Sequence, residues 1–74
     1  MSALEMDRFC RKFAILSQYN PGWEAQRLLQ AFLVEHWIEI RHYENPEILV
    51  QNVFTEFQRR EDERRSADSR SAPE

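Results

Sequence analysis

The stretch EHWIEIRH, residues 35–42, holds the best arranged set of side chains that could bind a metal. Glu39 and His42 have the Glu-x-x-His spacing, which puts a carboxylate and an imidazole on one side of a helix, and Glu35 lies one turn earlier. Carboxylate-bridged di-iron bundles use this spacing twice and point both copies into a core. The chain has one copy, on a ridge expected to face water, so we predict neither a metal nor a cofactor. A metal site shared between two chains of a dimer stays a minor alternative.

Other candidates for chemistry are isolated residues. His36 falls on the apolar side of its expected helix and has no cysteine or serine nearby in sequence to activate. Cys10 falls within an apolar stripe, where a thiol behaves as a small buried hydrophobe. A single glycine excludes a glycine-rich phosphate loop. We therefore expect a protein that is not an enzyme.

Three helix starts explain how the chain positions these residues. Ser2 and Glu5 fit the capping box Ser-x-x-Glu, and Asn-Pro occurs at residues 20–21 and again at 45–46. Asparagine is a preferred N-cap and proline is favoured just inside a helix, so each Asn-Pro predicts a helix start and the end of the helix before it. The sequence predicts helices over residues 3–18, 21–43 and 46–64 and shows no strand signals.

Hydrophobic periodicity supports an all-α fold, either a three-helix bundle or a helical hairpin with a long central helix. The apolar stripes expected to form the core are Met6, Phe9, Cys10, Phe13 and Leu16 in the first helix and Leu49, Val50, Val53, Phe54 and Phe57 in the third. The chain of 74 residues, 42% of them hydrophobic, is long enough for one small domain. We place this domain at residues 1–65 and predict a disordered charged tail over residues 66–74, which has no apolar anchor.

The central helix is apolar around more of its circumference than two neighbouring helices can cover. Val34 and Ile38 lie more than about 100° from the centre of its main apolar face, at 100° per residue. Trp37 lies on the border between that face and this second patch, and tryptophan is frequent among binding hot spots. We predict that Val34, Trp37 and Ile38 bind a partner, which is a larger protein, a second copy of the chain in a homodimer, or both. The expected function is a small non-catalytic interaction module: an adaptor, co-chaperone or inhibitor that binds through a helix face.

The arginine-rich segment 59–65 suggests an alternative, a nucleic-acid-associated regulator with Arg59 and Arg60 as contact residues. The charge balance disfavours it. The net charge is −3, and residues 1–58 carry five positive and eight negative side chains. Within the segment, acidic residues 61–63 separate the arginines and would repel phosphate.

The subcellular location is predicted from the absence of a signal peptide pattern and of a long apolar run. The first thirteen residues carry charges where a signal peptide has its apolar core, and no apolar run approaches the ~20 residues of a membrane span. We expect a cytoplasmic protein with no membrane partner.

Overall fold

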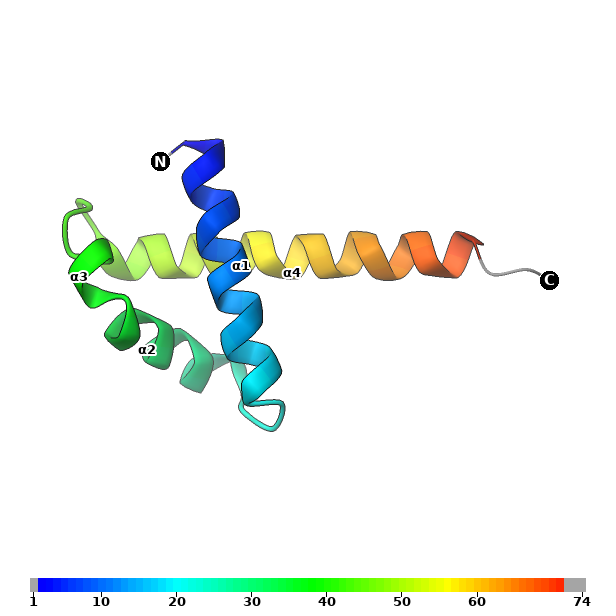
Figure 1. Ribbon diagram of the computed structural model, residues 1–74, viewed down its shortest axis with the longest axis horizontal. Helices are drawn as coiled ribbons and strands as arrows, with labels where there is room; N and C mark the ends of the chain where they lie inside the picture. Colours follow the sequence, from blue (N-terminus) through cyan, green and yellow to red (C-terminus); the bar gives the residue numbers. More distant parts are fainter. Residues whose placement is uncertain (1, 72–74) are drawn as a thin grey trace.

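The computed structural model describes the backbone of residues 2–71 and the side chains of residues 2–67. The described chain is helical and contains no strand; its helices are α1 (Ala3–Tyr19), α2 (Ala25–Glu35), α3 (Trp37–Ile40) and α4 (Pro46–Ser71). Figure 1 shows α1 crossing α4 at a steep angle, with α2 and α3 filling the corner between α1 and the start of α4. The molecule measures 49 × 29 × 15 Å because α4 extends well past the other helices. The all-α prediction is confirmed.

Helix α1 begins with the predicted capping box. The backbone N–H of Glu5 donates to Ser2 Oγ at 3.2 Å, and the N–H of Ser2 donates to Glu5 Oε1 at 3.1 Å. Two otherwise unpaired backbone donors are thereby satisfied at a helix end that faces solvent. The predicted range, 3–18, differs from the observed one by a single residue.

The first Asn-Pro does not start a helix. The side chain of Asn20 turns back, and its Nδ2 donates to the carbonyl of Leu16 at 2.9 Å, so Asn20 closes the C-terminal end of α1. The carbonyl of Asn20 accepts from the N–H of Trp23 at 3.1 Å, which forms a turn through Pro21 and Gly22. Helix α2 therefore starts four residues later than predicted, at Ala25.

The prediction of one long central helix over residues 21–43 is also wrong. The helix breaks at His36, where φ is −110° and ψ is 22°, and the four-residue helix α3 follows. Neither proline nor glycine lies in this stretch. After the break, Ile40 is fully buried and the ring of Tyr43 packs edge-on against Phe9, with centroids 6.2 Å apart. The break therefore coincides with the burial of Ile40 in the core and the contact of Tyr43, which follows α3, with α1, and no local helix breaker accounts for it.

The second Asn-Pro acts as predicted. Pro46 is the first residue of α4, and Asn45 caps it with Oδ1, which accepts from the N–H of Ile48 at 3.4 Å. The helix then continues to Ser71, past the predicted end at residue 64. The predicted disorder of residues 66–74 is not confirmed, and residues 72–74 lie outside the described residues. No helix breaker occurs between Glu47 and Ser71, and glutamate–arginine pairs three or four residues apart support the extension.

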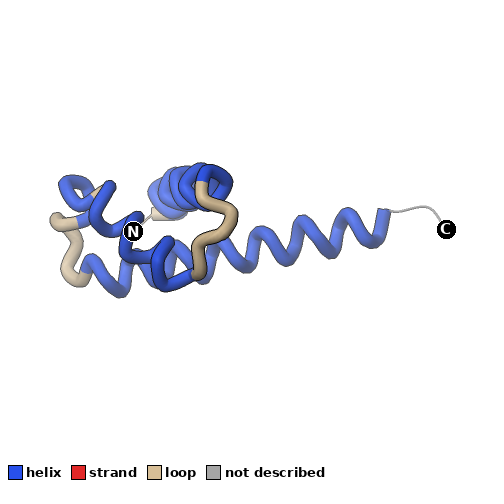
Figure 2. Tube along the Cα trace, turned by 90° about the horizontal axis from the view of Figure 1, so that it is seen from below, coloured by secondary structure: helices blue, strands red, loops and turns tan. Residues whose placement is uncertain are grey.

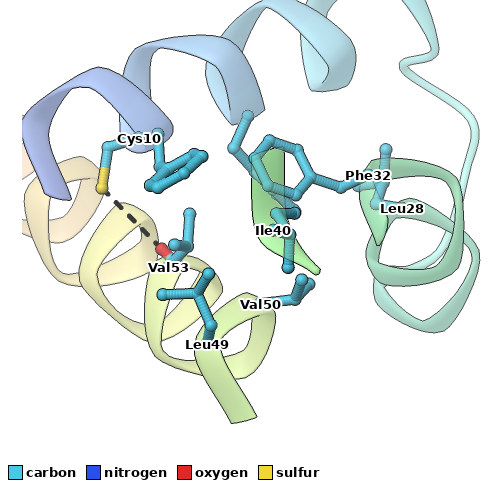
Figure 3. Close-up of a cluster of buried hydrophobic side chains, with 9 residues drawn as sticks. Cys10, Leu28, Phe32, Ile40, Leu49, Val50 and Val53 are labelled. Carbon is cyan, nitrogen blue, oxygen red and sulfur yellow. Dashed lines mark hydrogen bonds between the residues drawn. The ribbon is translucent and has the colours of Figure 1, made fainter. Parts of the chain in front are cut away.

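The core lies where α1, α2, α3 and the first half of α4 meet (Figure 3). Phe13 is its centre, with ring centroids 5.3 Å from Phe32, 5.6 Å from Phe54 and 5.1 Å from Phe57. Both predicted stripes face this core. Among the described side chains, the buried ones are all apolar: Phe9, Cys10, Phe13, Leu28, Phe32, Ile40, Leu49, Val50 and Val53.

Candidate interaction surface

Residues 33–43 form a ridge with an inner and an outer side. Burial alternates along it with a period of about three and a half residues, as expected for a helical segment that packs on one side. This alternation continues through the break at His36, so α2 and α3 share one outer side. The partly or fully buried residues are Leu33, His36, Glu39, Ile40 and Tyr43, and the exposed ones are Val34, Glu35, Trp37, Ile38, Arg41 and His42.

Three apolar side chains occupy this outer side, and we call them the outer patch: Val34, Trp37 and Ile38. Val34 is 74% exposed, Ile38 is 73% exposed and Trp37 is 47% exposed. Three of the predicted partner-binding residues are therefore exposed on the outer side of the ridge, whereas Arg59 and Arg60 lie on α4. Single exposed apolar residues are common on soluble proteins, but neighbouring ones that include a tryptophan are characteristic of binding surfaces.

The inner side of the ridge is fixed to α1. Lys12 Nζ donates to both carboxylate oxygens of Glu39, at 3.1 and 2.8 Å. The hydrogen bond from Lys12 lowers the pKa of Glu39. His36 lies half-buried with its ring 4.5 Å from that of Phe32, and burial, followed by the charge of Lys12, lowers the pKa of its imidazole. The inner side beneath the outer patch is thus held by the Lys12–Glu39 ion pair and by packing of His36 on Phe32.

A shallow groove borders each flank of α2. Between α2 and α4, a hollow of about 210 Å³ has an apolar floor with polar residues around it; its lining is Gln26, Leu29, Gln30, Leu33, Glu47, Val50 and Gln51. Between α1 and α2, a hollow of about 350 Å³ is lined by Lys12, Ile15, Leu16, Tyr19, Asn20, Glu35 and His36. The sequence analysis missed the second groove. The sequence feature that could have predicted this groove is the pair Ile15 and Tyr19. They lie one turn apart on α1, outside its core stripe, and are exposed.

The metal-binding candidates do not converge. Glu39 is engaged by Lys12, while Glu35 and His42 are exposed on the outer side. Among the residues that the structure describes, no three of His, Cys, Asp and Glu come together in a way that could hold a metal ion.

Cys10 is buried, its Sγ lies 3.8 Å from the carbonyl oxygen of Val53, and burial raises the pKa of its thiol. A thiol in this state is a poor nucleophile.

Arg59 and Arg60, the predicted contact residues of the alternative function, lie beside carboxylates. Both donate to Glu56, Arg59 also pairs with Glu63, and Arg60 Nη1 donates to Asp7 Oδ1 of α1 at 2.9 Å. Ion pairing within the protein reduces the positive charge available to a phosphate backbone. Arg60 also links α4 to α1, which gives it a structural role.

Within residues 2–71, no helix combines the length and apolar character needed to cross a membrane. Comparisons of the chain with protein-family models, curated proteins and solved structures found no match.

Proposed function

We propose that this chain is a small non-catalytic interaction module that acts as an adaptor, co-chaperone or inhibitor by covering a surface of a larger protein. The outer patch carries this proposal. Its three side chains leave a large apolar area in water on a ridge whose inner side is already packed. Covering a fully exposed valine or isoleucine gains about 1.5–3 kcal/mol each, which is enough to influence binding.

The composition of the outer patch fits binding better than folding. Trp37 is half-exposed beside two aliphatic residues, and an indole ring supplies a large contact area at a small cost in side-chain entropy. Exposed polar and charged residues, Gln30, Glu35 and Arg41, neighbour the patch along the chain. An apolar centre with a polar rim is the usual arrangement of a protein–protein interface. We place this activity in the cytoplasm as part of the same proposal, which localisation of a tagged protein would test.

The test uses the tagged full-length chain as bait in extracts of its source organism. The double variant Trp37→Ala, Ile38→Glu is expected to lose a partner that the wild-type chain retains, while its helicity by circular dichroism stays near the wild-type value. Ile48→Glu is the matched control, because Ile48 is an apolar side chain 52% exposed on a different helix, α4. This control should still capture the partner.

Two results would contradict the proposal. If the double variant is unfolded while Ile48→Glu is folded, Trp37 and Ile38 contribute to folding and are not a free surface. If the double variant is folded and captures the same proteins as the wild type, the outer patch is not the binding site.

A further inference from the structure

His36 joins α2 to α3 through its own backbone. The residue belongs to neither helix, with φ at −110° and ψ at 22°. Its N–H donates to the carbonyl of Phe32 at 3.0 Å, at the end of α2, and its carbonyl accepts from the N–H of Ile40 at 2.9 Å, in α3. A change in the surroundings of His36 therefore acts on the junction between the two helices.

The side chain at this junction is one whose charge changes near neutral pH. The imidazole of histidine has an ordinary pKa of 6.5. In His36 it is only 25% exposed, and its ring packs on that of Phe32 with centroids 4.5 Å apart. Its Nδ1 lies 3.9 Å from Glu39 Oε2, which is too far for a hydrogen bond. A proton gained at Nδ1 would therefore not be bonded to Glu39 in this arrangement.

The nearby carboxylate is already engaged by cations of α1. Lys12 Nζ lies 2.8 Å from the same Oε2 atom of Glu39, and Arg8 lies 3.9 Å from Oε1. Burial, followed by the charge of Lys12, lowers the pKa of His36, although Glu39 and Glu35 of α2 act in the opposite direction. A protonated imidazole would compete with Lys12 for one oxygen atom and would repel its ammonium group.

The direction of the pH effect follows from this lowered pKa. An opened junction, with the imidazole in water, binds the proton at the ordinary pKa of 6.5 and hence more readily than the closed junction. The stability of the closed junction is therefore complete above about pH 6.5 and falls as the pH drops from there towards the lowered pKa of His36. Glu39 stays ionised in this range, because the hydrogen bond from Lys12 lowers its own pKa from 4.5.

We propose that His36 is a pH-responsive hinge, at which a gained proton loosens the hold of α1 on α3 and so disturbs the outer patch. Val34 lies before the hinge on α2, whereas Trp37 and Ile38 lie after it on α3. A movement of α3 therefore changes how these three side chains are placed relative to one another. The consequence for binding, weaker capture of a partner in acid, rests on the proposed function; the hinge itself does not.

The experiment is amide hydrogen exchange of the full-length chain, followed by nuclear magnetic resonance at several pH values. The amides of Ile40 and Arg41 report on α3, because they donate to the carbonyls of His36 and Trp37 at 2.9 and 2.8 Å. Their protection should be at least about tenfold lower than that of Phe13 in the core, which marks an opening smaller than global unfolding. From about pH 7.5 to about pH 5.5 it should fall between about threefold and tenfold, as one coupled proton allows.

Three variants identify the group responsible. His36→Gln keeps a polar side chain that takes up no proton and should abolish the fall in α3 protection. His42→Gln makes the same change at an exposed histidine and should retain the fall. Lys12→Gln removes the competing cation, so the imidazole resonance of His36 should titrate at higher pH than in the wild type, and the fall should be smaller.

A protection of α3 that does not change with pH overturns the proposal, as does a fall that persists in His36→Gln. Equal protection of the α3 amides and Phe13 also overturns it, because the proton then acts on the whole fold and not at a hinge. Failure of the proposed function has a different mark. It would appear as unchanged capture, or loss of folding, in Trp37→Ala, Ile38→Glu, and the exchange measurement needs no partner.

Discussion

The two halves of α4 are held in helical form by different interactions. In the first half, residues 46–57, Leu49, Val50 and Val53 are buried and the rings of Phe54 and Phe57 pack on Phe13. In the second half, Arg60 still pairs with Asp7 of α1. After Arg60, α4 leaves the body of the protein and has no other helix beside it (Figures 1 and 2). Its described side chains make local ion pairs, such as Arg64 with Glu61 at 2.9 Å.

The difference shows how a polar segment stays helical. Ion pairs at three- or four-residue spacing contribute about 0.2–0.5 kcal/mol each, which is too little to offset the cost of starting a short isolated helix. The second half of α4 needs no new start, because the packed first half already supplies the first turns. The second half, which is stabilised by ion pairs, is therefore helical because it continues the first half, which is stabilised by burial. The predictions below test that dependence.

The largest effect is expected from Phe13→Ala, which removes the ring that joins α1 to α2 and α4. Such a truncation in a packed core costs about 3–5 kcal/mol of unfolding free energy. In a chain this small, the loss should unfold the first half of α4 and, with it, the second half. Urea unfolding followed by tryptophan fluorescence and by helical ellipticity would measure this. Ile48→Ala, at a half-exposed position, is the control and should change little. If helical ellipticity of α4 persists in Phe13→Ala after tryptophan fluorescence shows the body unfolded, the second half of α4 is not coupled to the core.

An intermediate effect is expected from acid, acting on the contact between α1 and the segment before α4. The hydroxyl of Tyr43 donates to Glu5 Oε2 at 2.5 Å, and this bond, together with the donors of Ser2, lowers the pKa of Glu5 to about 2 from its usual 4.5. Because the unfolded chain takes up the proton at higher pH than the folded one, this contribution is present above about pH 4.5 and is lost as the pH falls towards 2. Tyr43→Phe removes the bond.

The measurement for this prediction is the urea midpoint between pH 7 and pH 2.5. Tyr43→Phe should be less stable than the wild type at pH 7, and the gap should narrow as the pH falls. The carboxylate of Glu56, whose pKa is also lowered to about 2, by Arg59 and then Arg60, is unchanged in both proteins and cancels in the comparison. A gap that stays constant with pH would show that the bond to Glu5 does not contribute.

The smallest effect is expected from removing the second half of α4. A chain that ends at Glu61 keeps the ion pair of Arg60 with Asp7, and the described side chains that it loses, residues 62–67, are all exposed. The free energy of unfolding of the body should stay within about 0.5 kcal/mol of the full-length value. Urea unfolding monitored by tryptophan fluorescence gives this difference. A larger loss would show that the second half supports the body and is not merely supported by it.

The two Asn-Pro pairs mark the limit of what sequence alone could predict. Both have the same local preferences, yet Asn45 caps the start of α4 while Asn20 closes the end of α1. Asparagine can serve either purpose, and the choice at residue 20 depends on where α2 must begin in order to pack on α1. The break at His36 likewise has no helix-breaking residue; it coincides with the burial of Ile40 in the core and with the packing of Tyr43 on Phe9, which is distant in sequence.

The sequence by itself determined the capping box of α1, the start of α4 and the apolar stripes of both helices. These features depend on residues within a few positions of one another. It also predicted the exposure of Val34, Trp37 and Ile38, because a helix that is apolar around much of its circumference has more apolar side chains than its neighbours can bury. It could not show that Glu39 pairs with Lys12, whereas Glu35 and Arg41 form no ion pair among the described side chains. Only the tertiary structure decided that, since an ion pair between α1 and α3 depends on how two distant segments pack.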